Sequence, residues 1–193
     1  MKTQSIHRRS GFTLIELLVV IAIIAVLASA GFGVGMKVQN TARKQVAESA
    51  ARNVVHAVNS FYADYSAMPV PTGTASTQGG TTFGTESGDG LKILDILLGL
   101  EDEINTKKVK YLDVPEAKSK KKGGLVFNKS GKEVSGMFDP WGNPFFIVLD
   151  TDYAERLEFK PSKKQETLNG RRCAVYSAGQ DKKIGTADDV KTW

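Results

Sequence analysis

Three carboxylates near the C-terminus are the residues with the clearest capacity for chemistry. Asp181, Asp188 and Asp189 lie within nine residues, interspersed with glycine. Calcium is a hard cation that binds several oxygen ligands at about 2.3–2.6 Å, and a loop that returns Asp188 and Asp189 towards Asp181 would supply them. The spacing is not that of an EF-hand. On spacing alone, a solvated acidic turn is the simpler interpretation and calcium binding is the alternative.

A second acidic group, Glu16, stands at the head of a long apolar segment. No charged residue occurs from Leu17 through Met36, a run of 20 positions, and about 20 apolar residues allow a helix to cross a bilayer. A carboxylate inside a membrane costs about 2.5–3.5 kcal/mol on insertion scales, so Glu16 requires a partner. A cut between Gly11 and Phe12 would create an α-amino group that could neutralise Glu16 of a neighbouring subunit.

One long helix is expected to carry Glu16 into the rest of the chain. Apolar and aromatic residues recur mainly at four-residue steps: Val38, Ala42, Val46, Ala50, Val54, Val58, Phe61, Tyr62 and Tyr65. Such spacing is typical of one helix face. We predict a single helix from Phe12 to Tyr65, ended by the prolines within residues 68–71. Gly31, Gly33 and Gly35 predict either local melting or close helix packing.

The remaining sequence predicts a loop, a short helix and an antiparallel sheet. Residues 69–90 are rich in Gly, Thr and Ser, which indicates a loop or flexible insert. Asp89 is expected to cap a short helix that buries Leu91, Leu94, Leu97 and Leu98 and ends at Gly99. Strands are expected at 125–127, 145–149, 157–159 and 173–176. Between the first two, we expect Trp141 to cover the sheet edge from a proline-rich turn.

Residues 11–16, Gly-Phe-Thr-Leu-Ile-Glu, resemble the processing site of type IV pilins and type II secretion pseudopilins. The resemblance implies that a prepilin peptidase cuts after Gly11, that Phe12 becomes N-methylated and that Glu16 sets the assembly register. The turn Asp-Pro-Trp-Gly at 139–142 independently resembles a segment of the major, G-type pseudopilin.

The C-terminal segment also resembles the calcium loop of G-type pseudopilins. The resemblance implies Ca²⁺ as a cofactor, bound through side chains and backbone oxygens. The side-chain ligands would be Asp181, Asp188 and Asp189, and the backbone ligands Ala178 and Thr186. Lys182 stands where relatives often have glycine, and Lys183 adds a second positive charge.

The fold implied is α+β and type IV pilin-like, with a long N-terminal helix on a small antiparallel sheet. The corresponding division is a leader at 1–11, a transmembrane and assembly helix at 12–36, an amphipathic half at 37–68 and a periplasmic head at 69–193. Within the head, 69–137 is a variable insert and 138–193 holds the sheet and calcium loop.

The function implied is that of a structural subunit of a type II secretion pseudopilus. Its partners would be prepilin peptidase, other pseudopilins, the inner-membrane assembly platform with its ATPase, and exoproteins at a secretin. Arg8 and Arg9 keep the leader cytoplasmic under the positive-inside rule, so the single-pass chain places its head in the periplasm. A type IV pilin, or a pilin-like subunit for adhesion or DNA uptake, is the alternative.

Composition weakens the other classes of function. Lys2, Arg8 and Arg9 precede the cut, so the net charge falls from +5 to +2, and no aromatic residue interrupts the lysines at 118–122 to stack on bases. A nucleic-acid partner is therefore not expected. The single Cys173 excludes an internal disulfide, whereas many type IVa pilins carry one, so its absence favours pseudopilins.

Two further interpretations remain. Ala28-Ser29-Ala30 is an A-x-A site for signal peptidase, so the N-terminus could also be an ordinary secretory signal, or an uncut anchor. An enzyme is not expected, because the chain has no nucleophile elbow, no zinc-ligand spacing and two histidines placed in the leader and the helix. A hydrolase that uses carboxylates alone would pair Asp139 with Asp150 or Asp152.

Overall fold

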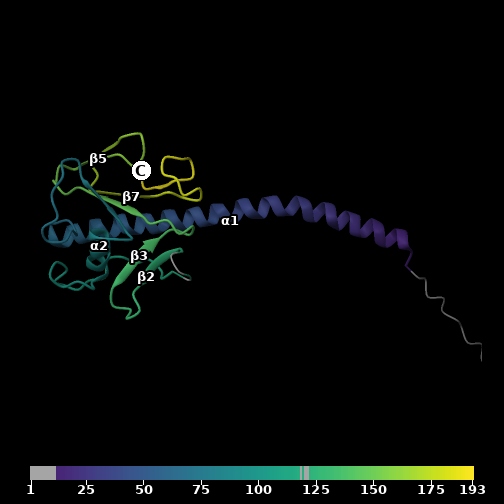
Figure 1. The fold of residues 1–193 in the computed structure, drawn as a ribbon, viewed down its shortest axis with the longest axis horizontal. Coiled ribbons are helices and arrows are strands. Elements are labelled where there is room, and N and C mark those ends of the chain that lie inside the picture. Colours follow the sequence, from purple (N-terminus) through teal and green to yellow (C-terminus); the bar gives the residue numbers. More distant parts are fainter. Residues whose placement is uncertain (1–11, 118, 120–121) are drawn as a thin grey trace, which may run out of the picture. The chain divides into compact units, whose positions relative to one another are not determined.

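The computed structural model describes residues 12–117, 119 and 122–193, and it confirms the α+β class (Figure 1). The elements in chain order are α1 (Leu14–Tyr65), β1 (Thr81–Gly84), α2 (Asp89–Leu98), β2 (Gly124–Phe127), β3 (Val134–Phe138), β4 (Phe146–Leu149), β5 (Arg156–Phe159), β6 (Glu166–Asn169), β7 (Cys173–Ser177) and β8 (Val190–Lys191). The chain divides into two units between Thr41 and Ala42.

The first unit consists of the N-terminal part of α1. The helix begins at Leu14, two residues later than predicted, and it remains continuous through Gly31, Gly33 and Gly35. From Phe12 to Ser29 every side chain is exposed, and most of these side chains are apolar. Within the described residues, no helix is both long enough and apolar enough to cross a membrane. The membrane span predicted at 12–36 includes residues 30–36, and the structure does not describe the side chains of these residues.

In the second unit, α1 buries a face that differs in part from the predicted stripe. The residues with no exposed surface on this face are Ala47, Ala51, Val54, Val58 and Phe61. Val46, a member of the predicted stripe, is 52% exposed. A helix has about 3.6 residues per turn, so a strict four-residue step drifts around the axis, whereas alternating steps of four and three stay on one face. The prediction was therefore right for Val54, Val58 and Phe61 and wrong for Val38, Ala42 and Val46, which are exposed.

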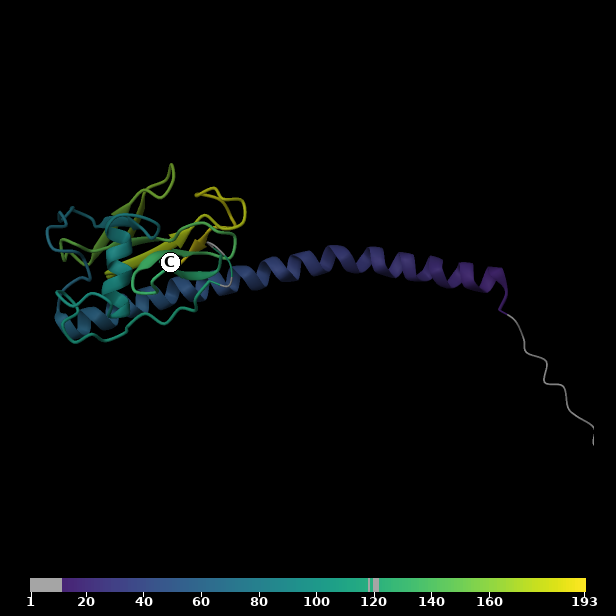
Figure 2. The same cartoon turned by 60° about the horizontal axis from the view of Figure 1, so that its bottom comes forward.

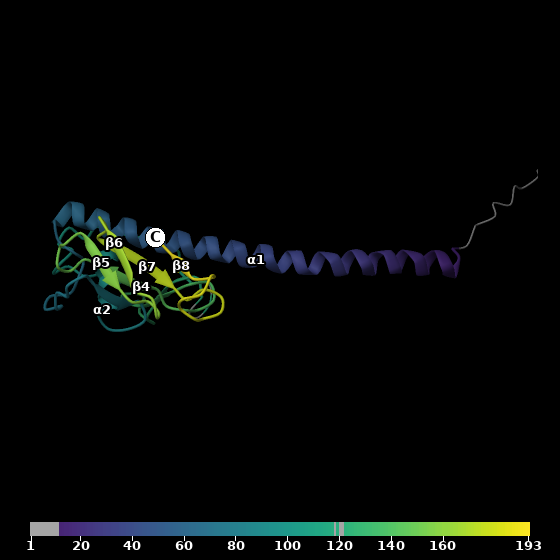
Figure 3. The ribbon, with the colours of Figure 1, turned by 90° about the horizontal axis from the view of Figure 1, so that it is seen from above.

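The main sheet has the strand order β1-β4-β7-β8, and every neighbouring pair is antiparallel. Successive side chains of a strand point to opposite faces. Ile147 and Val175 are therefore register partners on the face that packs with α1 and α2 in the main core. Their neighbours Val148 and Ala174 belong to a second cluster on the other face. Figure 3 shows β4 and β7 beside the C-terminal half of α1.

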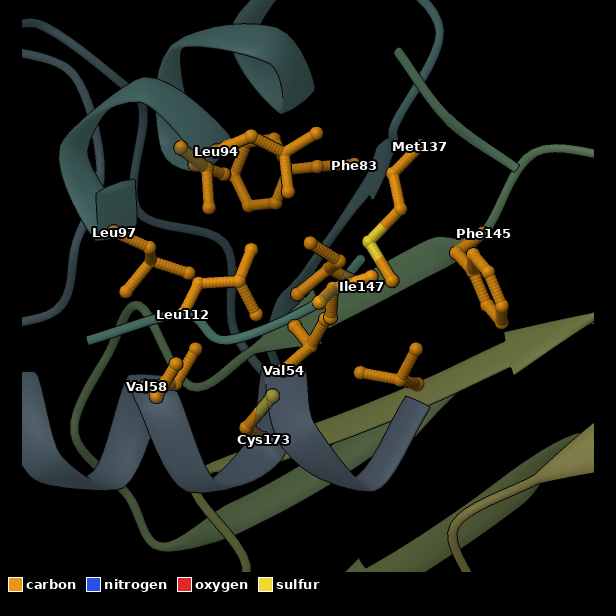
Figure 4. Packing of buried hydrophobic residues seen from close by; sticks show 14 of the residues in the cluster. Val54, Val58, Phe83, Leu94, Leu97, Leu112, Met137, Phe145, Ile147 and Cys173 are labelled. Carbon is orange, nitrogen blue, oxygen red and sulfur yellow. The ribbon is translucent and has the colours of Figure 1, made fainter. Parts of the chain in front are cut away.

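The main core joins the long helix, the short helix and the sheet. Figure 4 shows Val54 and Val58 of α1, Leu94 and Leu97 of α2, and Ile147 of β4 around one apolar space. The predicted burial in α2 is confirmed for Leu94, Leu97 and Leu98, whereas Leu91 is only partly buried. The predicted end is also confirmed, since Gly99 adopts a left-handed φ of 72°. The predicted cap was wrong, because Gly88 precedes the helix and makes no side-chain cap bond. Asp89 instead accepts a hydrogen bond from Lys92.

Aromatic rings cover the outer face of the sheet. The ring of Trp193 lies edge-on to Phe159 and Tyr176, with centroid distances of 5.2 Å and 6.0 Å. Ile184, from the connection between β7 and β8, packs against the same cluster. This packing stabilises the position of the connection that carries the predicted calcium ligands.

The four predicted strands are confirmed, and the expected loop at 69–90 is corrected in part. Thr81–Gly84 forms β1, which pairs with β4 at the edge of the main sheet. The strands β3, β6 and β8 were also not predicted, and β3 and β6 complete hairpins with β2 and β5. Trp141 is half-buried and packs against the main core.

Candidate functional site

The carboxylate of Glu16 is held by Thr13, the residue that precedes the helix. Thr13 donates to Glu16 Oε2 from its backbone N, at 2.8 Å, and from its hydroxyl, at 2.7 Å. Glu16 N in turn donates to Thr13 Oγ1 at 3.3 Å. This reciprocal pair is a capping box, which satisfies N–H groups that an isolated helix start leaves unpaired. The single chain therefore already provides polar partners for Glu16, although none of them is a cation.

The processing residues are only partly within the described chain. Gly11 and the basic residues Arg8 and Arg9 lie outside the described residues, together with the rest of the leader. Phe12 is 80% exposed at the first described position. Cleavage after Gly11 and methylation of Phe12 therefore stay predictions.

The acidic loop, residues 178–189, connects β7 to β8 and is drawn in yellow in Figure 2. Asp188 is its centre, because Oδ2 accepts from Asp181 N at 2.8 Å and Oδ1 accepts from Thr186 Oγ1 at 2.6 Å. The hydroxyl of Thr186 lowers the pKa of Asp188 by stabilising the charged form. Asp189 Oδ2 accepts from Gly185 N at 2.8 Å.

The two ends of the acidic loop meet at Gly179. This residue has a φ of +67°, and a Cβ atom there would lie 2.3 Å from the carbonyl oxygen of Asp188. Such an approach is open only to glycine. It brings the Ala178 end of the loop beside Asp188, and the hydrogen bond from Asp181 N places Asp188 beside Asp181 as well.

Two carboxylates of this loop place oxygen atoms close to the hydroxyl of Thr186. Its hydroxyl lies 2.6 Å from Asp188 Oδ1 and 3.4 Å from Asp189 Oδ1. Asp181 differs, because its carboxylate accepts from Lys183 N at 2.7 Å. Over the described part of the chain, no three His, Cys, Asp or Glu side chains form a group that could hold a metal. The donor chemistry of Thr186, Asp188 and Asp189 suits Ca²⁺, whereas Asp181 would have to turn from its backbone partner.

A buried hydrogen-bond network fixes the loop to the preceding turn. Asp139 has no exposed surface, and its carboxylate accepts from Trp141 N, Asn143 N, Asn143 Nδ2 and Ser177 Oγ at 2.7–2.9 Å. Asn143 Nδ2 also donates to Gly179 O at 2.6 Å. Because this carboxylate is fully paired, its burial is tolerated. The Asp-Pro-Trp-Gly turn therefore positions the start of the acidic loop.

The carboxylates considered for hydrolysis have structural partners. Asp139 belongs to the network described above, and Asp150 accepts from Ala154 N at 3.0 Å and Glu155 N at 2.8 Å. Burial raises the pKa of Asp150. Asp152 accepts from Gly79 N at 3.1 Å and so ties the loop before β1 to the turn after β4. These groups close turns of the fold.

Two comparisons relate the chain to known proteins. The prokaryotic N-terminal methylation motif matches residues 6–32. Over 187 residues, the chain is 26% identical to the type II secretion system core protein G of Aeromonas hydrophila, with 97% of this chain and 94% of that protein covered. The chain thus carries the N-terminal methylation motif and is distantly similar to a type II secretion core protein over nearly its full length. No solved structure matches it. The pseudopilin family is structural and non-enzymatic, in agreement with the prediction.

Several residues that shape these sites were not singled out in the sequence. Thr13 was detectable, since Thr-x-x-Glu before an apolar run is the signature of a capping box. Asn143 contacts Gly179, and Ser177 contacts Asp139, across segments that are distant in the sequence. The same holds for Lys44, which donates to Ala187 O at 3.2 Å from α1. No local pattern indicates such contacts.

Proposed function

We propose that this pseudopilin-like chain is a subunit of a type II secretion pseudopilus. It would be processed by prepilin peptidase and assembled from the inner membrane, with the leader cytoplasmic and the head periplasmic. Its partners would be other pseudopilins, an inner-membrane assembly platform with its ATPase, and exoproteins that leave through a secretin. The N-terminal methylation motif joined to full-length similarity to a core protein G carries this proposal.

The exposure of the first unit supports an assembly role. Leu14 and Ile15 are 85% and 70% exposed, and apolar side chains continue along the helix to Leu27. A contiguous apolar surface of this kind requires a lipid or protein environment. Residues 12–36 would anchor the chain in the inner membrane before assembly and pack against other subunits afterwards.

The N-terminal peptide of the native protein tests the processing step. We expect the membrane-isolated protein to begin with N-methylated Phe12, detected by mass spectrometry. A cell without prepilin peptidase provides the control and should yield the unprocessed chain. A mature protein that begins at Gly31 would instead indicate signal-peptidase release and overturn the proposal.

The role of Glu16 is tested separately from membrane insertion. We expect Glu16→Ala to abolish fibre assembly while the protein remains in the membrane fraction, because the proposed inter-subunit pairing with the Phe12 amine is lost. Glu48→Ala, on the same helix but in the second unit, is the matched control. Normal fibres from Glu16→Ala would contradict the assembly role of this carboxylate.

We also propose that the acidic loop binds Ca²⁺. The ligands would be the carboxylates of Asp181, Asp188 and Asp189. The backbone oxygens of Ala178 and Thr186 would complete the site. When bound, the ion would neutralise these carboxylates and stabilise the loop, since binding free energy adds to folding free energy. The oxygen set around Thr186 and the close return of the chain at Gly179 support this proposal.

Calorimetric titration of the full chain in detergent micelles tests the calcium proposal. Asp188→Asn should weaken binding by at least about tenfold, because one charged ligand is lost. Asp113→Asn removes an exposed carboxylate before β2 and should leave binding unchanged. If the unmodified chain binds no Ca²⁺ at millimolar concentration, the calcium proposal fails while the pseudopilus proposal stands.

A further inference from the structure

Two lysines reach the acidic loop from other elements of the second unit. Lys191, on β8, places its ammonium 3.3 Å from Asp189 Oδ2. Lys44, on α1, donates to the carbonyl oxygen of Ala187 at 3.2 Å. The chain thus brings positive charge to the same segment, residues 186–189, from both the sheet and the long helix.

Asp189 is the carboxylate of the loop that most needs a counter-charge. Its side chain is only 2% exposed, whereas Asp181 is exposed and Asp188 is partly exposed. A buried carboxylate is strongly destabilising unless it is paired and hydrogen-bonded. Asp189 has both kinds of partner, since Gly185 N donates to it and Lys191 supplies the charge.

The position of Lys191 is itself constrained. Its ammonium lies 5.8 Å from the ring centroid of Trp193, which packs against the outer face of the sheet. The side chain of Lys191 is 31% exposed, so its stem lies along the protein while the charged end reaches Asp189. This arrangement limits the conformations of Lys191 and lowers the entropic cost of the ion pair.

We propose that Lys191 is an internal cation of the acidic loop, which holds Asp189 when calcium is absent and competes with calcium for that carboxylate. The competition rests on the calcium binding proposed above. An ammonium and a calcium ion repel each other at one carboxylate, so Lys191 must move away for Asp189 to bind the metal. Lys44 donates to the neighbouring carbonyl oxygen of Ala187 and so ties this segment to α1.

Thermal unfolding of the full chain in micelles, with EGTA and with excess Ca²⁺, tests the internal ion pair. Lys191→Met keeps most of the stem and removes the charge, and we expect its Tm in EGTA to fall by about 2–4 °C. Lys191→Arg should retain the stability of the unmodified chain. Lys182→Met, an exposed lysine of the same loop, is the matched control and should change little. An unchanged Tm for Lys191→Met in EGTA would overturn the proposal.

A double-mutant cycle separates the ion pair from lost packing. If Lys191 acts through Asp189, Lys191→Met should cost far less stability in an Asp189→Asn background. Equal costs in both backgrounds would show that Lys191 acts by packing on Trp193, and would contradict its role as a cation.

Calcium titration then tests the competition. We expect Lys191→Met to bind Ca²⁺ about tenfold more tightly than the unmodified chain, since no ammonium must be displaced. An unchanged or weaker affinity would overturn the competition. If no variant binds Ca²⁺ while Lys191→Met is less stable in EGTA, the calcium proposal and the competition both fail, and the internal ion pair is retained.

Discussion

Thr13 and Glu16 satisfy each other at the start of α1, through three hydrogen bonds of 2.7–3.3 Å. The acid that the sequence marks as an assembly residue is therefore also a helix-capping residue. In the single chain, the capping box keeps the carboxylate in a polar setting at the end of an exposed apolar helix. Any cation supplied by a neighbour must add to these contacts or replace them.

The capping box predicts a local effect of Thr13→Ala. Loss of the hydroxyl should cost about 1 kcal/mol of local helix stability, because Glu16 N loses its acceptor. Amide hydrogen exchange in the first turn of α1 should then become about fivefold faster in micelles. Thr13→Ser retains the hydroxyl and should exchange at nearly the original rate. Equal exchange for Thr13→Ala and the unmodified chain would show that the cap contributes nothing.

The buried network around Asp139 predicts that two substitutions within it will destabilise the fold by different amounts. Asp139→Ala removes the shared acceptor of four hydrogen bonds and should destabilise the fold by about 3 kcal/mol or more. Ser177→Ala removes one donor and should cost about 1–2 kcal/mol. Denaturant unfolding gives both values. If the two changes cost the same, Ser177 and not the whole network would hold the turn.

A side chain at position 90 is expected to cause a steric clash that outweighs the higher helix propensity of alanine. Alanine favours a helix by about 1 kcal/mol over glycine, but a Cβ on Gly90 would lie 1.9 Å from the carbonyl oxygen of Gly84. Because backbone atoms cannot move aside cheaply, we expect Gly90→Ala to destabilise the fold by about 2 kcal/mol. Gly84→Ala, where the nearest atom is 3.8 Å away, is the control for denaturant unfolding. A more stable Gly90→Ala protein would contradict the close approach of α2 and β1.

The raised pKa of Asp95 predicts that the stability of the fold depends on pH. Burial raises the pKa of its carboxyl, assisted by Glu133 and Glu101 and opposed by the hydrogen bond from Val134 N. A raised pKa in the folded state means that stability is lost as pH rises through that pKa. Asp95→Asn should therefore be the more stable protein at pH 7, and the difference should shrink towards pH 3, below the carboxyl's ordinary pKa of 3.8. Urea unfolding at the two pH values measures it, and a constant difference would exclude this titration.

The long helix and the central strands were predictable because their signals are local. The apolar stripe and the prolines define the end of α1 at Tyr65, and runs of branched and aromatic residues define β4 and β7. The missed strands lack such signals. Thr81–Gly84 lies in a Gly- and Thr-rich segment, and it forms a strand because β4 offers it an unpaired edge. Pairing with β4, and not a local sequence signal, therefore determines that β1 is a strand.

In the candidate sites too, residues with a local sequence signal could be predicted, whereas contacts between distant segments could not. Glu16 and the three aspartates could be identified by residue type and spacing, as could the glycine-rich character of their loop. Lys191 lies two residues after Asp189, but that spacing alone does not show that the two side chains pair. The contact of Ser177 with Asp139 could not be identified, since it joins segments 38 residues apart. A contact between distant segments depends on strand register, which a single sequence specifies only through its hydrophobic pattern.

Cys173 lies against α1 within the main core, as Figure 4 shows, and burial raises the pKa of its thiol. The chain's single sulfur nucleophile is thus both shielded and protonated, so it resists alkylation and oxidation in the folded protein. A fibre built from many copies would then contain no reactive thiols of its own. Any cysteine introduced at the surface would be a unique chemical handle, and subunit contacts could be mapped by cross-linking without first removing the native residue.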